Sequence, residues 1–166
     1  LLDYLTCYLA AFAQAQVAAG ADVIVIADPT ATGEILGPAH FRAFARPYLW
    51  RLAEAVKAAG AGVIIHICGN ATPLLEEIRE ISPHACSFDS VVSIKKARAA
   101  LRGLPSMGNI STRVLHRGSP ETVARAAQRA REHGVSIIAP ACGIDLQTPL
   151  VNLRALTNTV KGRPPL

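Results

Sequence analysis

The chain has 166 residues, of which 51% are hydrophobic and 17% are charged, and its formal net charge is +5. This length suits a single domain with a real hydrophobic core, and no apolar run approaches the length of a membrane span, so neither disorder nor a membrane protein is expected. The basic residues are scattered through helical segments without interleaved aromatics, which is typical of a solvated surface and argues against nucleic-acid binding.

Short apolar runs alternate along the chain with longer segments of helical pattern. In chain order we expect a helix over 3–19, a strand over 23–27, a helix over 39–59, a strand over 62–67, a short helix over 72–81, a strand over 85–89, a helix over 93–101, a weaker strand over 104–108, a helix over 120–133, a strand over 135–139 and a last helix after 148–149. Pro47 is expected to kink or divide its helix, and Thr72 to act as an N-cap.

This alternation predicts an α/β fold in which about five βα units build a parallel sheet. One architecture is a partial (β/α)8 TIM-type barrel, with residues 1–166 as a single domain. The simpler alternative is a flavodoxin-like five-stranded sheet. Five units do not close an eight-stranded barrel, so its open edges are expected to be covered by a missing half or by pairing in a homo-oligomer.

The residues with the clearest chemistry follow two expected strands. Side chains alternate along a strand, so His66 and Cys68 point to the same side, and Gly69 lets the chain turn directly afterwards. Cys142 lies just past the last expected strand. An imidazole and two thiolates are good zinc ligands, and three protein ligands leave one position open, as in catalytic sites. The residues alone leave a second interpretation open, namely buried cysteines and a hydrogen-bonded histidine.

Further polar residues lie at the same ends of the expected strands. Asp28, Asp89 and Asn109 are candidates for a substrate pocket, and Glu34 is a candidate fourth metal ligand. Asp28 has an equally good interpretation as a loop residue that accepts backbone N–H bonds, and Asp89 as a partner for a histidine ring. Asn70 is a candidate cap for the turn after Gly69.

The two remaining cysteines indicate no chemistry. Cys7 lies in an apolar helix and Cys86 in an expected strand, so both are predicted to be small buried hydrophobic residues. The cysteine pattern has no secretory context, and the first segment has no basic leader, so a cytoplasmic location is expected.

Several segments resemble the uroporphyrinogen decarboxylase superfamily, and in particular its methylcobamide:coenzyme M methyltransferase branch. They are GADVIVIADPTATGEILGPAHFRAFARPYLWRL, HICGNATPLL, FDSVVSIKKAR, MGNIST and IIAPACGI. The similarity covers nearly the whole chain and corresponds to the C-terminal half of the family's barrel. It implies that the N-terminal strands of that barrel are not part of this sequence.

The resemblance implies a function and a site. In the methyltransferase branch an H-x-C pair and a later cysteine hold Zn²⁺, which implies His66, Cys68 and Cys142 here. The implied reaction moves a methyl group from a methylcobamide, bound to a partner corrinoid protein, to a small thiol such as coenzyme M. Two rivals stay open: a uroporphyrinogen decarboxylase-like enzyme, which needs no metal and lacks the H-x-C pair, and a catalytically silent half-barrel that serves as a binding module.

Overall fold

A computed structural model describes residues 1–162 of the chain. Its elements alternate between helices and strands in the order that the sequence predicts. They are α1 (Leu2–Ala18), β1 (Val23–Asp28), α2 (Gly37–His40), the π-helical segment η1 (Phe41–Ala45), α3 (Arg46–Ala58), β2 (Gly62–Ile67), the 3₁₀ turn η2 (Thr72–Leu74), α4 (Leu75–Glu80), β3 (Ala85–Phe88), α5 (Ile94–Leu101), β4 (Ser106–Ile110), α6 (Thr112–Arg117), α7 (Pro120–Glu132), β5 (Ile137–Pro140) and α8 (Leu150–Val160).

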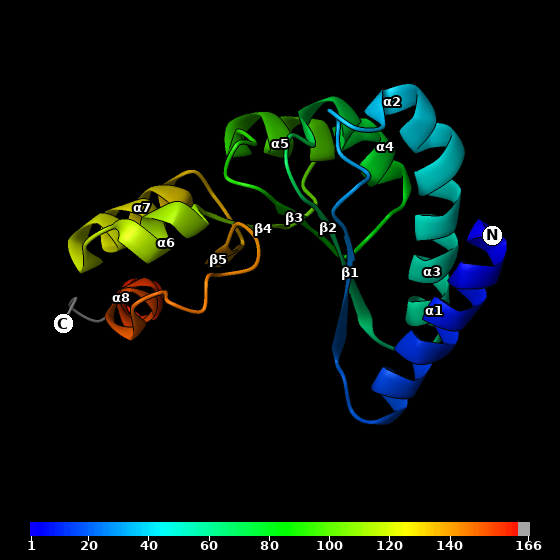
Figure 1. The fold of residues 1–166 in the computed structure, drawn as a ribbon, viewed down its shortest axis with the longest axis horizontal. Coiled ribbons are helices and arrows are strands. Elements are labelled where there is room, and N and C mark those ends of the chain that lie inside the picture. Colours follow the sequence, from blue (N-terminus) through cyan, green and yellow to red (C-terminus); the bar gives the residue numbers. More distant parts are fainter. Residues whose placement is uncertain (163–166) are drawn as a thin grey trace.

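The five strands form one parallel sheet in the order β1-β2-β3-β4-β5, so each strand pairs with the next one in the sequence. The helices form an arc around one side of this curved sheet (Figure 1). A flavodoxin-like sheet has the order 2-1-3-4-5, so the flavodoxin-like alternative is excluded. Strands in sequential order with helices on one side are the arrangement of a (β/α) barrel, and five such units make a partial barrel.

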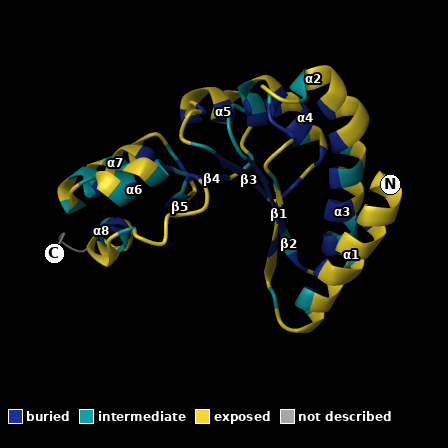
Figure 2. Cartoon of the chain, in the orientation of Figure 1, coloured by how far each residue is buried: buried dark blue, intermediate teal, exposed yellow. Residues whose placement is uncertain are grey.

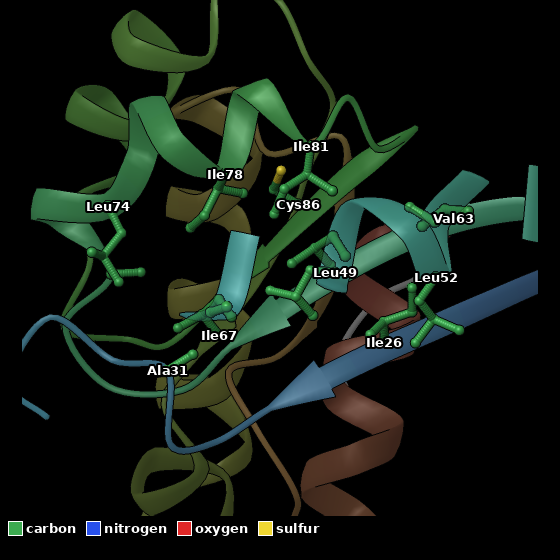
Figure 3. Packing of buried hydrophobic residues seen from close by; sticks show 14 of the residues in the cluster. Ile26, Ala31, Leu49, Leu52, Val63, Ile67, Leu74, Ile78, Ile81 and Cys86 are labelled. Carbon is green, nitrogen blue, oxygen red and sulfur yellow. The ribbon is translucent and has the colours of Figure 1, made fainter. Parts of the chain in front are cut away.

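The two faces of the sheet have different surroundings. Ile24 and Ile26 of β1 point toward the helices and belong to the main hydrophobic core, part of which Figure 3 shows. Val23 and Val25 alternate with them on the concave face and are 49% and 51% exposed. The alternation holds in β3, where Cys86 lies in the same core and its neighbour Ser87 does not. Burial of the helix-facing side therefore fixes which residues line the concave face.

The strand register places one row of side chains across the concave face. Ala27 pairs with His66, His66 with Ser87, Ser87 with Met107, and Met107 with Ile137. Paired residues on neighbouring parallel strands point to the same side of the sheet. His66 therefore stands in the middle of a row that is otherwise apolar except for Ser87.

The long helix expected over 39–59 is divided as predicted. Pro47 has no N–H and its ring crowds the preceding turn, and a π-helical segment, Phe41–Ala45, lies directly before α3. Glu77 of α4 fastens this irregular segment, because its buried carboxylate accepts hydrogen bonds from Arg42 Nε at 2.7 Å and Arg46 Nη1 at 2.8 Å. Arg42 holds the pKa of Glu77 below its usual value.

Several details of the sequence prediction are wrong. Thr72 is not an N-cap, because Ala71 precedes the turn η2 and Asn70 Oδ1 instead accepts a hydrogen bond from Thr72 N at 3.1 Å. A short helix, α6, forms where no element was expected. The strand expected over 104–108 begins two residues later, at Ser106.

Cys7 is exposed and not buried as predicted, whereas Cys86 is buried as predicted. The sequence of α1 is apolar on all sides, and the helix turns Thr6 and Ala13 inward. This inward side of α1 packs on α3, and much of the rest of α1 lies on the surface (Figure 2). Within residues 1–162, no helix combines the length and apolarity that crossing a membrane requires.

Candidate metal centre

Three potential ligand atoms converge at the carboxyl end of the sheet. The Nε2 atom of His66 lies 3.1 Å from Cys68 Sγ, and Cys68 Sγ lies 3.4 Å from Cys142 Sγ. All three ligand atoms lie within 4.8 Å of one another, although 74 residues separate the two cysteines. The cluster that the sequence predicts is therefore assembled by the fold.

The end of β2 places His66 and Cys68 in the cluster. His66 is buried in the concave row, and Cys68 follows two residues later at the strand exit, half-buried. Gly69 then adopts a φ of +64°, a conformation that favours glycine, and its N–H donates to Asp89 Oδ2 at 3.2 Å. The turn directly after Cys68 is thus fixed by the loop that follows β3.

Cys142 comes to the cluster from the edge strand of the sheet, β5. It follows β5, and the preceding residue, Ala141, donates its N–H to Ile110 O at 2.8 Å, which continues the pairing of β4 with β5. Cys142 is exposed, whereas His66 is buried. The cluster therefore has a buried nitrogen side and an open sulfur side.

The electrostatics of the site favour the neutral forms of His66 and Cys68. Burial lowers the pKa of His66, an effect that the negative charge of Asp89 partly opposes. Burial and the contact with Cys142 raise the pKa of Cys68 to about 11, and the negative charges of Asp89 and Asp28 act in the same direction. At neutral pH His66 is a free base and Cys68 is a thiol.

A pocket of about 350 Å³ opens beside the cluster on the concave face. Val25, Ala27, Met107 and Ala139 supply an apolar lining, and the three clustered residues together with Ser87 supply its polar groups. A mostly apolar pocket with a few convergent polar atoms suits a small ligand.

The other candidate residues support the cluster from outside it. Asp28 Oδ1 accepts hydrogen bonds from Thr30 N, Thr30 Oγ1 and Ala31 N, so it organises the loop after β1. Both carboxylate oxygens of Glu34 lie 3.2 Å from Asn70 N, and among the described residues Glu34 is not part of the ligand cluster.

Asp89 and Asn109 form a connected support. Asn109 Nδ2 donates to the backbone oxygens of Asp89 at 3.2 Å and of Val92 at 2.9 Å, while Asp89 accepts from Gly69 N. The chain of contacts runs from β4 through the loop after β3 to the turn that carries Cys68. In this structure both side chains therefore hold the loops around the cluster.

Sequence reasoning missed Ser87. Its Oγ lies 2.9 Å from His66 Nδ1, and both side chains are buried. The signal was a polar residue inside the apolar strand ACSF, but only the register between β2 and β3 shows that it stands opposite His66.

Comparisons with known proteins show the family of this chain. The sequence profile of the family described as uroporphyrinogen decarboxylase (URO-D) matches residues 1–163. The "Methylcobamide:CoM methyltransferase MtbA" of Methanosarcina acetivorans is 35% identical over 162 residues, which cover 97% of this chain and 48% of that protein. A uroporphyrinogen decarboxylase of Thermus thermophilus is 30% identical over 166 residues, or 97% of this chain and 47% of that protein.

A solved structure, a methyltransferase from Methanosarcina mazei, superimposes with a TM-score of 0.90 at 34% identity. The superposition covers 96% of this chain and 48% of that one. The chain thus spans about half the length of the relatives it matches. Profile, sequence similarity and fold agree, and the chain belongs to the uroporphyrinogen decarboxylase family, with methylcobamide:CoM methyltransferases among its relatives.

Proposed function

We propose that this chain carries the zinc-binding part of a methyltransferase that moves a methyl group from a methylated corrinoid protein to a small thiol such as coenzyme M. The observation that carries the proposal is the convergence of His66 Nε2, Cys68 Sγ and Cys142 Sγ beside an apolar pocket. The names of several relatives, methylcobamide:CoM methyltransferases, support the same reaction.

The donor set fits zinc. Tetrahedral zinc with bonds of roughly 2.0–2.3 Å places its nitrogen and sulfur ligands about 3.5–3.8 Å apart. The contacts of 3.1 and 3.4 Å in the cluster need only a small expansion to meet that geometry. Three protein ligands leave a fourth position for a substrate atom, and when bound the metal would lower the pKa of an acceptor thiol there.

The residues of the chain prepare the site for such a thiol. Neutral His66 offers a nitrogen lone pair, Cys68 offers a sulfur once its proton leaves, and Cys142 offers a second sulfur. The apolar wall next to them would exclude water from the acceptor once further strands cover the concave face, and a desolvated sulfur is more reactive. Cys142 lies on the exposed side, so a large donor held by a partner protein has access from solvent.

The proposed transfer is a polar displacement. The acceptor thiol gives its proton to solvent, and its sulfur then attacks the methyl carbon of the methylated corrinoid. A carbon–sulfur bond forms as the cobalt–carbon bond breaks, and the bonding electron pair stays with cobalt, which passes from Co(III) to Co(I). The products are a methyl thioether and the reduced corrinoid, and the protein contributes alignment of the reactants.

Methyl transfer is tested by incubating the zinc-loaded protein with a methylated corrinoid and a panel of thiols. We expect loss of the methylcobalt absorption together with stoichiometric methyl thioether, and coenzyme M is the first thiol to try. Cys142→Ser is expected to show no transfer above the uncatalysed rate. Decarboxylation of uroporphyrinogen in place of methyl transfer would contradict the proposal, and absence of any turnover once the remaining barrel strands are supplied would indicate a silent binding module.

Zinc affinity is expected to rise with pH. The pKa of Cys68, raised to about 11, lies above neutral pH, so each zinc ion that binds must displace its proton. Each displaced proton makes the apparent affinity about tenfold higher per pH unit, so we expect at least a roughly 100-fold increase between pH 6 and pH 8. Competition with a chelator of known pH dependence measures it. An affinity that is constant or falls over this range would contradict the thiol ligand.

We also propose that further strands cover the concave face in the working enzyme, with this chain as the C-terminal part of a complete barrel. Val23, Val25 and Ile137 leave that face apolar and between 42% and 51% exposed. Apolar strands of this kind are normally covered in (β/α) barrels. The relatives, about twice as long as this chain, have the length needed to do so.

A further inference from the structure

We propose that Ser87 is a positioning residue that makes Nε2 of His66, and not Nδ1, the metal-binding atom. The inference rests on the proposed zinc site and adds a residue that carries no metal bond itself. The hydroxyl of Ser87 would keep the imidazole in one tautomer and one orientation, with the lone pair of Nε2 aimed at the two sulfurs.

The contact between the two residues follows from the sheet. Ser87 of β3 is the register partner of His66 of β2, so both side chains stand side by side on the concave face. Ser87 Oγ lies 2.9 Å from His66 Nδ1, while Nε2 on the other side of the ring lies 3.1 Å from Cys68 Sγ. The two ring nitrogens thus have different partners, a hydroxyl and a thiol.

This division of partners matters because a neutral imidazole carries only one N–H. Nε2 can bind a metal only when its lone pair is free, which places the hydrogen on Nδ1. A buried N–H needs an acceptor, and Ser87 Oγ is placed to accept it. Histidine ligands commonly donate their second ring N–H in this way, and loss of the acceptor usually lowers metal affinity about 10- to 100-fold.

The chain supplies a matched control on the next strand. Ser106 of β4 is also buried, and its Oγ has no hydrogen-bond partner among the described residues. Its neighbour Met107 lines the concave pocket, so Ser106 points to the opposite, helix-facing side. Removing its hydroxyl changes a buried serine of the same sheet without touching His66.

The experiment compares wild type with Ser87→Ala, Ser87→Thr and Ser106→Ala. Zinc affinity is measured by chelator competition at one pH, and the ligand field by the absorption spectrum of the cobalt(II)-loaded protein. We expect Ser87→Ala to bind zinc about 10- to 100-fold more weakly and to shift the cobalt spectrum. Ser87→Thr, which keeps the hydroxyl, is expected to stay within about threefold of wild type, and Ser106→Ala to match it. Thermal unfolding of each variant checks that it folds.

A further measurement separates this inference from the proposed function. In metal-free protein, ¹⁵N NMR of the histidines reports the tautomer of His66, which we expect to be the Nδ1–H form in wild type and a mixture in Ser87→Ala. The inference is overturned if Ser87→Ala matches wild type in affinity and tautomer, or if folded Ser87→Thr is as weak as Ser87→Ala. A wild type that binds no zinc would refute the metal site, and the tautomer would then decide the role of Ser87.

Discussion

Replacing Cys142 with Ser is expected to weaken zinc binding by roughly a hundred- to a thousandfold. Structural zinc sites with four protein ligands are worth roughly 10–16 kcal/mol, which corresponds to about 2.5–4 kcal/mol for each ligand. A serine hydroxyl keeps its proton at neutral pH and does not replace the thiolate. Because Cys142 is exposed and follows the strand β5, its loss should leave the core intact. Zinc content after dialysis against a chelator measures the effect.

Cys7→Ser is the matched control for this prediction. Cys7 is an exposed cysteine on α1 and is not part of the ligand cluster. The Cys7 variant should retain zinc as wild type does, while the Cys142 variant loses it. Equal retention of zinc in both variants would show that the sulfur of residue 142 is not a ligand.

Replacing Leu115 with Ala is expected to lower the free energy of unfolding by about 2–5 kcal/mol. Leu115 is fully buried in a second, smaller hydrophobic cluster, in which α6, α7 and α8 pack with Ile94 of α5 and Ile110 of β4, apart from the main core. Its backbone oxygen also accepts a hydrogen bond from the buried side chain of Asn152 at 2.8 Å, which ties α6 to α8. A small cluster has few neighbours that can move to fill the cavity, so the loss should lie toward the upper part of that range.

The consequence should reach the metal site, because Cys142 lies on the segment between β5 and α8. Urea unfolding measures the stability, and hydrogen exchange locates the change, which we expect in α6–α8 before the main core. Leu146→Ala, on a fully exposed residue of the same segment, should change stability by less than about 0.5 kcal/mol. A Leu115 variant as stable as that control would contradict the existence of a separate cluster whose few neighbours cannot fill the cavity.

The ligand cluster could be predicted because two simple rules converge on it. Alternation along a strand puts His66 and Cys68 on one side, and parallel strands bring their carboxyl ends to one edge, where Cys142 also lies. Neither rule specifies distance. The distance of 3.4 Å between the two sulfurs depends on how far the sheet curves between β2 and β5. No local sequence pattern predicts that curvature.

The missed features share a different cause. The contact of Ser87 with His66 can be recognised only from the pairing between strands. The helix α6 has six residues, which is too short to show a helical period in the sequence. Cys7 was misplaced because α1 is apolar on all sides, so its sequence does not indicate which face turns inward. The packing partner, α3, selects that face in the folded chain.

X-ray absorption at the zinc edge of the zinc-loaded wild-type protein tests the proposed metal site most directly. The site predicts one zinc per chain with two sulfur neighbours at about 2.3 Å and the remaining neighbours, nitrogen or oxygen, at about 2.0–2.1 Å. A protein that retains no stoichiometric zinc, or whose bound zinc has a number of sulfur neighbours other than two, would contradict coordination by His66, Cys68 and Cys142.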